Sequence, residues 1–199
     1  MELRDYQNEV IDNVTHAMHL GYRSTLCALF TGAGKTVVFA TLAKMLPGRT
    51  LIICPLRELV WQAMAKCRDI VGDDVELEMA EYRATSGESE WTDPAKVVVA
   101  CKQTLLSRAG DGKRYSRLRG FDLVVVDEAH MQCSEPVVEM LKHFQDDGAF
   151  VAGFTATPFR MDGQPMLTEG ACDFTNQSQQ TTEFSGALTT DTQSRLFGN

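Results

Sequence analysis

The chain has 199 residues, of which 44% are hydrophobic and 23% charged, a balance typical of one soluble globular domain and not of a disordered chain. Its 19 basic and 27 acidic residues leave a net charge of −8, which disfavours binding to nucleic acid through charge alone. The sequence has no long apolar run and no basic-then-apolar start, so we expect no membrane-spanning helix and no secretory signal. Six scattered cysteines without a Cys-x-x-Cys pair favour reduced thiols, no structural zinc site, and a cytoplasmic, nucleoid or nuclear location.

Short apolar runs alternate with helical patterns over most of the chain. In chain order the pattern predicts a helix at 5–20, a strand at 24–30, a helix at 35–46, a strand at 50–54, a helix at 57–71, strands at 96–101 and 121–127, a helix at 135–146 and a strand at 150–155. The central strands lack in/out alternation, which indicates burial on both faces. We therefore expect an α/β fold, with a mainly parallel central sheet covered by helices on both faces. Trp61 and Met64, on one predicted helix, are expected to pack in the core.

A Gly-rich loop joins the first predicted strand to the next helix. The loop residues with the phosphate-binding pattern are Thr31, Gly32, Ala33, Gly34, Lys35 and Thr36. Backbone N–H groups of such a loop converge on phosphate oxygens, and the helix N-terminus adds partial positive charge. Lys35 is expected to reach the β- and γ-phosphates of a nucleotide, and the Thr36 hydroxyl to ligate Mg²⁺. Leu29 stands where the general pattern has its first glycine, so the generic motif is incomplete.

Two adjacent acids end a later apolar strand. Asp127 and Glu128 follow Leu-Val-Val-Val and precede Ala129 and His130. Carboxylates in such a place are costly to bury unless they bind a cation or are paired. Asp127 is expected to hold Mg²⁺ through water, and Glu128 to orient and deprotonate the attacking water. Together with the Gly-rich loop, these acids predict a nucleoside-triphosphate hydrolase site.

Charge is unevenly distributed along the chain. Residues 102–119 hold six basic side chains against Asp111 alone, which suits a contact to nucleic-acid phosphates, although a solvated surface helix has the same pattern. Residues 161–199 contain five acids and only Arg195 as a base, and are rich in Thr, Ser, Gln and Gly. We expect this part to be a weakly ordered extension of a domain that spans residues 1–160.

These motifs resemble, in order, those of the first RecA-like domain of a superfamily 2 helicase, a P-loop NTPase. Leu3-Arg4-Asp5-Tyr6-Gln7 resembles the adenine-reading element, which implies that Gln7 bonds the adenine edge, that Arg4 lies nearby, and that ATP is the nucleotide. The stretch 31–36 matches the family's own motif I, which does not require the early glycine. Residues 127–130 match motif II in its DEAH form, which includes His130.

The same resemblance implies a nucleic-acid path and a coupling element. Residues 55–59 resemble motif Ia, and 103–106 the segment near motif Ib; the residues implied to contact nucleic acid are Arg57, Gln103, Thr104 and Arg108. Thr155-Ala-Thr-Pro resembles motif III, so Thr155, Thr157 and the following Arg160 are expected to couple nucleotide state to nucleic-acid binding. The extended motif III and the Leu-Arg-x-Tyr-Gln start are similar to DNA-directed DExH helicases and restriction-enzyme translocase subunits, so DNA is expected in preference to RNA.

In this family ATP binds between two RecA-like domains, and the second domain supplies an arginine finger. Nothing after Arg160 matches that second domain. We therefore expect this chain to bind ATP and Mg²⁺ but to hydrolyse ATP slowly unless a second RecA-like domain or partner subunit completes the site. One alternative is a non-catalytic nucleotide-binding module that acts as a switch or decoy for a partner helicase. Another is a self-assembling ATPase, in which a neighbouring copy supplies an arginine from 108–119.

Overall fold

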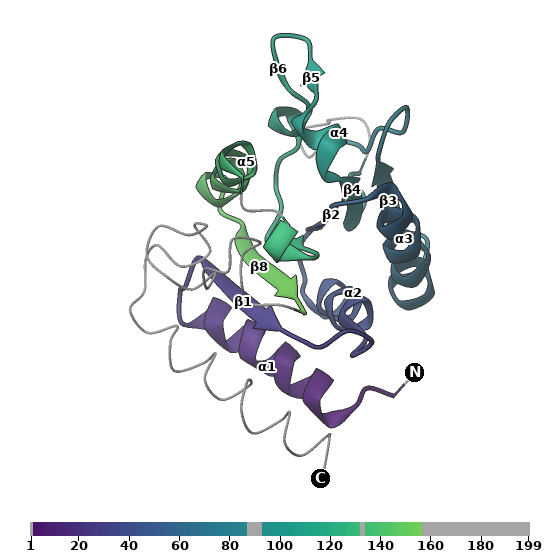
Figure 1. Cartoon of the computed structure of the whole chain (residues 1–199), viewed down its shortest axis with the longest axis vertical. Helices are drawn as coiled ribbons and strands as arrows, with labels where there is room; N and C mark the ends of the chain where they lie inside the picture. The colour runs from purple at the N-terminus through teal and green to yellow at the C-terminus, as the bar shows by residue number, and fades with distance from the viewer. Residues whose placement is uncertain (1, 87–92, 132–133, 157–199) are drawn as a thin grey trace.

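A computed structural model of the chain describes residues 2–86, 93–131 and 134–156 (Figure 1). Every strand and helix predicted above is present in it, with ends shifted by at most two residues. The strands of the main sheet are β1 Ser24–Ala28, β2 Thr50–Cys54, β3 Val75–Glu78, β4 Val97–Cys101, β7 Leu123–Val126 and β8 Phe150–Thr155. The α-helices are α1 Asp5–His19, α2 Lys35–Met45, α3 Arg57–Val71, α4 Lys102–Leu106 and α5 Glu135–Asp146. The small elements are the two-stranded hairpin β5 Arg108–Ala109 with β6 Gly112–Lys113, and the 3₁₀ turns η1 Arg114–Arg117 and η2 Ala129–Met131.

The main sheet has six parallel strands in the order β1-β8-β7-β2-β4-β3. Because all six strands run the same way, their carboxyl ends lie along one edge. That edge divides into two halves: β1, β8 and β7 form one, and β2, β4 and β3 form the other. Loops that follow the strands of one half therefore meet each other, which decides what each half can bind.

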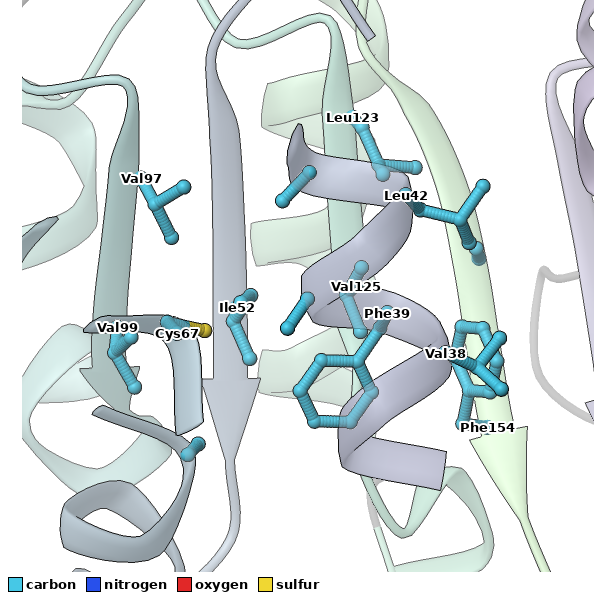
Figure 2. Packing of buried hydrophobic residues seen from close by; sticks show 14 of the residues in the cluster. Val38, Phe39, Leu42, Ile52, Cys67, Val97, Val99, Leu123, Val125 and Phe154 are labelled. Atoms are coloured by element: carbon cyan, nitrogen blue, oxygen red, sulfur yellow. The ribbon is translucent and has the colours of Figure 1, made fainter. Parts of the chain in front are cut away.

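Helices cover both faces of the sheet, as the sequence predicts. On one face α1, α2 and α3 pack through residues such as Val38, Phe39 and Cys67 against alternate strand residues such as Ile52 and Val125 (Figure 2). On the other face α5, α4 and η1 pack against the intervening strand residues. The central strands β2, β4 and β7 are buried at every position, which explains why they show no in/out alternation.

Several features of the fold differ from the sequence-based prediction, among them α4, the β5–β6 hairpin and the two 3₁₀ turns, which were not predicted. The strand β3 was also not predicted; its four residues Val-Glu-Leu-Glu alternate apolar and acidic side chains, and Glu78 is completely buried. The prediction that Trp61 packs in the core is wrong, since 48% of that residue is exposed, whereas Met64 is buried as expected. Among the described residues no helix is long and apolar enough to cross a membrane. The proposed extension at 161–199 lies outside the described residues.

Candidate active site at the carboxyl edge of the sheet

One half of the carboxyl edge brings the predicted nucleotide-binding residues together. The Gly-rich loop follows β1, Asp127 and Glu128 follow β7, and Thr155 ends β8 between them. The loop is tied to β8 because the N–H of Leu29 donates to the Thr155 carbonyl at 2.8 Å. Three segments that are distant in the sequence therefore share one site.

The conformation of the Gly-rich loop depends on glycine at position 34. Gly34 is the N-cap of α2 and has a φ of 79°, in the left-handed region. This backbone conformation favours glycine, and a Cβ at this position would also lie 2.7 Å from the Gln7 side-chain nitrogen, which would have to move. Within the loop Thr31 and Gly32 are exposed, and Thr36 is half-buried in the first turn of α2. This arrangement leaves the start of α2 open to a phosphate ligand.

The start of α1 holds the loop from one side. The Ala33 carbonyl accepts hydrogen bonds from Gln7 Nε2 at 2.8 Å and from the Tyr6 hydroxyl at 3.0 Å. Gln7 is buried, and its Oε1 accepts a bond from the Arg4 backbone N–H at 3.0 Å. The exposed Arg4 guanidinium donates to the Tyr6 hydroxyl at 3.2 Å. Gln7 thus connects the adenine-reading segment to the phosphate loop, and it keeps one N–H and one lone pair for a nucleotide. The sequence-based prediction assigned no role to Tyr6, although Tyr6 lies between Arg4 and Gln7, to which it did assign roles.

Lys35 and Glu128 form the central contact of the site. Lys35 Nζ donates to Glu128 Oε1 at 2.8 Å, and the two side chains are only 11% and 24% exposed. Glu128 has a φ of 47°, a left-handed conformation that is uncommon for a residue with a Cβ. Such strain is typical of residues whose position serves a ligand or reaction. The catalytic lysine and general base of the prediction are therefore paired with each other.

Asp127 is a buried carboxylate suited to a cation. The residue is 7% exposed, and its Oδ1 accepts a bond from the Glu128 N–H at 3.0 Å. Burial, and next the neighbouring Glu128 charge, raise the pKa of Asp127 to about 6, although Lys35 opposes the rise. Among the described residues no group of three or more His, Cys, Asp or Glu could hold a metal by itself. Asp127 and the Thr36 hydroxyl instead fit Mg²⁺, which is commonly held by one or two protein oxygens together with nucleotide phosphates.

His130 connects the acids to β8. Its Nδ1 lies 2.9 Å from the Thr155 hydroxyl and 3.4 Å from Glu128 Oε2. A continuous set of contacts therefore runs from Lys35 through Glu128 and His130 to Thr155. The other coupling residues of the prediction, Thr157 and Arg160, lie outside the described residues.

The predicted nucleic-acid residues lie on the other half of the edge, after β2 and β4. Arg57, Gln103 and Arg108 are exposed. Thr104 is half-buried, and its hydroxyl accepts a bond from the Ala80 N–H at 3.2 Å, so it also holds the segment that follows β3. These side chains lie apart from the Lys35–Glu128 contact, beyond β7 along the sheet.

The basic segment 102–119 divides into outward and inward residues, which corrects the simple phosphate interpretation. Arg114 is buried and Arg117 half-buried, and both form ion pairs with the fully buried Glu78. Arg119 contacts His143 on α5. Arg108 and Lys113 remain exposed on the hairpin. A carboxylate on β3, remote in the sequence, therefore decides which of these bases face solvent.

The fold and the site define this chain as the N-terminal RecA-like domain of a superfamily 2 helicase. It belongs to the family described as type III restriction enzyme, res subunit, which it matches over residues 1–160.

Three known proteins illustrate the likeness. The chain is 33% identical over 175 residues to the putative ATP-dependent helicase IRC3 of Saccharomyces cerevisiae, a match that covers 80% of this chain and 24% of that protein. It is 29% identical over 168 residues to the ATP-dependent DNA helicase mph1 of Neurospora crassa, covering 78% of this chain and 14% of that protein. The Hef helicase domain of Pyrococcus furiosus matches in structure with a TM-score of 0.59 and 26% identity, over 78% of this chain and 33% of that one. The chain thus spans a quarter or less of these two curated relatives.

Proposed function

We propose that the chain is the ATP-binding motor domain of an ATP-dependent DNA helicase or translocase, which couples Mg-ATP hydrolysis to its grip on DNA. The observation that carries this proposal is the set of contacts from Lys35 through Glu128 and His130 to Thr155. Those contacts connect a phosphate loop, a general base and the end of β8. A nucleotide that changes one of them changes the others.

The reaction begins when Lys35 exchanges its contact with Glu128 for a contact with the nucleotide phosphates. The ammonium group leaves Glu128 and contacts the β- and γ-phosphates, while the loop N–H groups bind the same oxygens. Thr36 and Asp127 would hold a Mg²⁺ ion, which would neutralise charge on the phosphates when bound. Glu128, released from Lys35, then accepts a proton from the water that attacks the γ-phosphorus, while the bond from that phosphorus to the β-phosphate oxygen breaks and ADP leaves. In the free chain Glu128 is held by Lys35, and a nucleotide that draws the lysine away releases it.

Release of Glu128 also alters the surroundings of His130. The imidazole contacts both Glu128 and the Thr155 hydroxyl, so a shift of the acid changes the histidine's bond to β8. The segment after Thr155 carries the remaining motif III residues, Thr157 and Arg160. We assign this route to communication between the nucleotide and the DNA-facing half of the edge.

DNA as the partner is supported by the resemblance to DNA-directed enzymes and by the similarity to mph1, an ATP-dependent DNA helicase. Arg57, Gln103, Thr104 and Arg108 are the proposed contacts. A second RecA-like domain or partner subunit is proposed to supply the arginine finger, which in related enzymes accelerates hydrolysis by about 10³–10⁵. The chain alone is accordingly expected to bind Mg-ATP and to turn it over slowly.

The proposal is tested by Mg-ATP binding and hydrolysis with the purified chain, with and without matched DNA and RNA strands. Lys35→Ala should weaken nucleotide binding about tenfold or more, because it removes charge-assisted bonds to phosphate. Lys44→Ala, at the exposed end of the same helix, is the matched control and should bind like the wild type.

An unchanged nucleotide affinity in Lys35→Ala would contradict the nucleotide site. Stimulation by RNA in preference to DNA would contradict the partner. Normal ATP binding with no hydrolysis, even when a second RecA-like domain is supplied, would favour the non-catalytic switch or decoy.

A further inference from the structure

Two large aromatic side chains that belong to none of the motifs form an exposed pair on the half of the edge formed by β2, β4 and β3. Trp61 lies one turn into α3, and Tyr82 lies in the turn after β3; they are 48% and 46% exposed. Their ring centroids are 5.9 Å apart, with the rings nearly perpendicular at 87°. We call Trp61 and Tyr82 the aromatic pair. Rings exposed in this way are more typical of binding surfaces than of folding cores.

The backbone under the aromatic pair is held firmly. Tyr82 and Met79 exchange backbone hydrogen bonds of 2.9 and 3.2 Å, which closes a tight turn. The Arg114 guanidinium donates to the carbonyls of Ala80 and Tyr82 and to Glu78. Because the arginine and its acid are buried, this anchor fixes the turn without occupying its outer surface.

The same arginine holds a projecting hairpin. The Arg114 N–H donates to the Ser107 carbonyl at 2.9 Å, at the base of β5 and β6. A hairpin with two residues in each strand is not stable by itself, so it depends on this attachment. Figure 1 shows the hairpin standing out from the rest of the molecule, at the end opposite α1. The hairpin and the aromatic pair therefore lie on two sides of one buried arginine.

The hairpin presents positive charge. Arg108 and Lys113 face each other directly across the two strands, and both are exposed. Like charges in that position destabilise a strand pair, and among the described residues neither has a carboxylate within ion-pairing distance. Arg114 and Arg117 share the single charge of Glu78, which leaves excess positive charge beneath the hairpin. An anion between Arg108 and Lys113 would relieve their repulsion.

We infer that this surface binds a single strand of DNA, with phosphates on Arg108 and Lys113 and one unpaired base stacked on the aromatic pair. The inference rests on the proposed function and names the form of DNA that this half of the edge takes. Stacking on an exposed ring requires a base that is free of its duplex partner. Glu58 lies one turn before Trp61 on α3, Glu81 precedes Tyr82, and both are exposed together with Arg57 and Arg83; the charges next to the aromatic pair in the sequence therefore balance, which suits an uncharged base, whereas the hairpin suits phosphate.

Tryptophan fluorescence tests the stacking. The chain has two tryptophans, so Trp91→Phe leaves Trp61 as the only one. Titration of that variant with oligo-dT should quench its emission, and a blunt duplex of the same length should quench it much less. In the otherwise natural chain, Trp61→Ala should weaken oligo-dT binding about five- to a hundredfold, as loss of one stacked base does elsewhere. Trp61→Phe should retain part of the affinity, and Leu20→Ala, an exposed apolar residue at the far end of α1, should retain all of it.

Salt dependence tests the hairpin. The plot of log affinity for oligo-dT against log salt should be less steep by about 1.4 in Arg108→Ala/Lys113→Ala, since each phosphate contact on a single strand contributes about 0.7. Lys142→Ala, an exposed lysine on α5, should leave the slope unchanged. Thermal unfolding of every variant confirms that each is folded.

Unchanged oligo-dT affinity in Trp61→Ala, an unchanged slope in the hairpin variant, or equal quenching by duplex would each overturn the inference. These outcomes leave the proposed function standing if the wild type still binds Mg-ATP in a Lys35-dependent way. A chain that binds Mg-ATP but no DNA would overturn both the inference and the DNA part of the proposed function. If nucleotide binding did not depend on Lys35 while oligo-dT still quenched Trp61, only the proposed ATP-dependent motor function would be contradicted.

Discussion

The two halves of the carboxyl edge are built on different principles. In the half formed by β1, β8 and β7 the functional side chains bond to one another, as Lys35 does to Glu128 and His130 does to Thr155. In the half formed by β2, β4 and β3 the exposed rings and charges project from the surface, and the ion cluster of Glu78, Arg114 and Arg117 behind them anchors the Tyr82 turn and the hairpin. The proposed nucleotide site is thus held by contacts among its own residues in the free chain, whereas the proposed DNA surface is exposed and supported from beneath.

The largest expected effect separates catalysis from binding in the nucleotide half. Glu128→Gln should lower Mg-ATP turnover by about 10²–10⁴, the usual contribution of a general base. Nucleotide affinity should fall little, because the amide keeps the shape of the side chain. Turnover and equilibrium binding are measured on the same preparation. A variant that turns over normally would show that another group accepts the proton.

Removal of the buried acid should break the other half. Glu78→Ala leaves Arg114 and Arg117 without their shared partner, so the free energy of unfolding should fall by about 3–5 kcal/mol. Denaturant unfolding measures the loss. Glu81→Ala, an exposed carboxylate a few residues away, should change stability by no more than about 0.5 kcal/mol. Equal losses in the two variants would mean that the buried ion cluster is not what supports this half.

Asp127→Asn should stabilise the free protein while it damages the Mg²⁺ site. The pKa of Asp127 is raised from 3.8 to about 6, so above pH 6 the folded chain carries a carboxylate that the unfolded chain ionises more readily. That cost is fully present above the folded pKa and disappears as pH falls through the unfolded value. The asparagine variant should therefore be more stable by about 1–3 kcal/mol at pH 8, with little difference near pH 4. Thermal unfolding without nucleotide or Mg²⁺ measures this, and a gain that grows toward low pH would contradict it.

The smallest effect concerns the bond between the segments after β4 and β3. Thr104→Val removes the acceptor for the Ala80 N–H, and should cost about 1 kcal/mol of stability. Ser107→Ala, whose hydroxyl bonds only within its own exposed turn, is the matched control. Unchanged stability would contradict this role of the bond and would leave Thr104 only its proposed contact with DNA.

The sequence predicts the nucleotide half well, for a physical reason. The Gly-rich loop acts through backbone N–H groups and through glycines that permit positive φ, so its local order of residues is sufficient to indicate a phosphate site. The apolar strands before it and before Asp127 similarly require burial wherever they lie. From these facts the parallel sheet, its two helical faces and the carboxyl-edge site follow.

Tertiary structure alone settled which side chains meet. Lys35 and Glu128 are 93 positions apart, and Arg114 is 36 positions from Glu78, so no local pattern reveals either pair. Charge counting placed Arg114 and Arg117 on the surface with Arg108, and helical spacing placed Trp61 in the core. Both predictions failed for one reason. Whether an acid such as Glu78 is buried or a ring such as that of Trp61 is exposed depends on which distant segments the fold places beside it. The backbone conformation of a loop depends on neighbouring residues, which the sequence shows directly. Side-chain contacts between residues far apart in the sequence form only when the sheet brings their strands together.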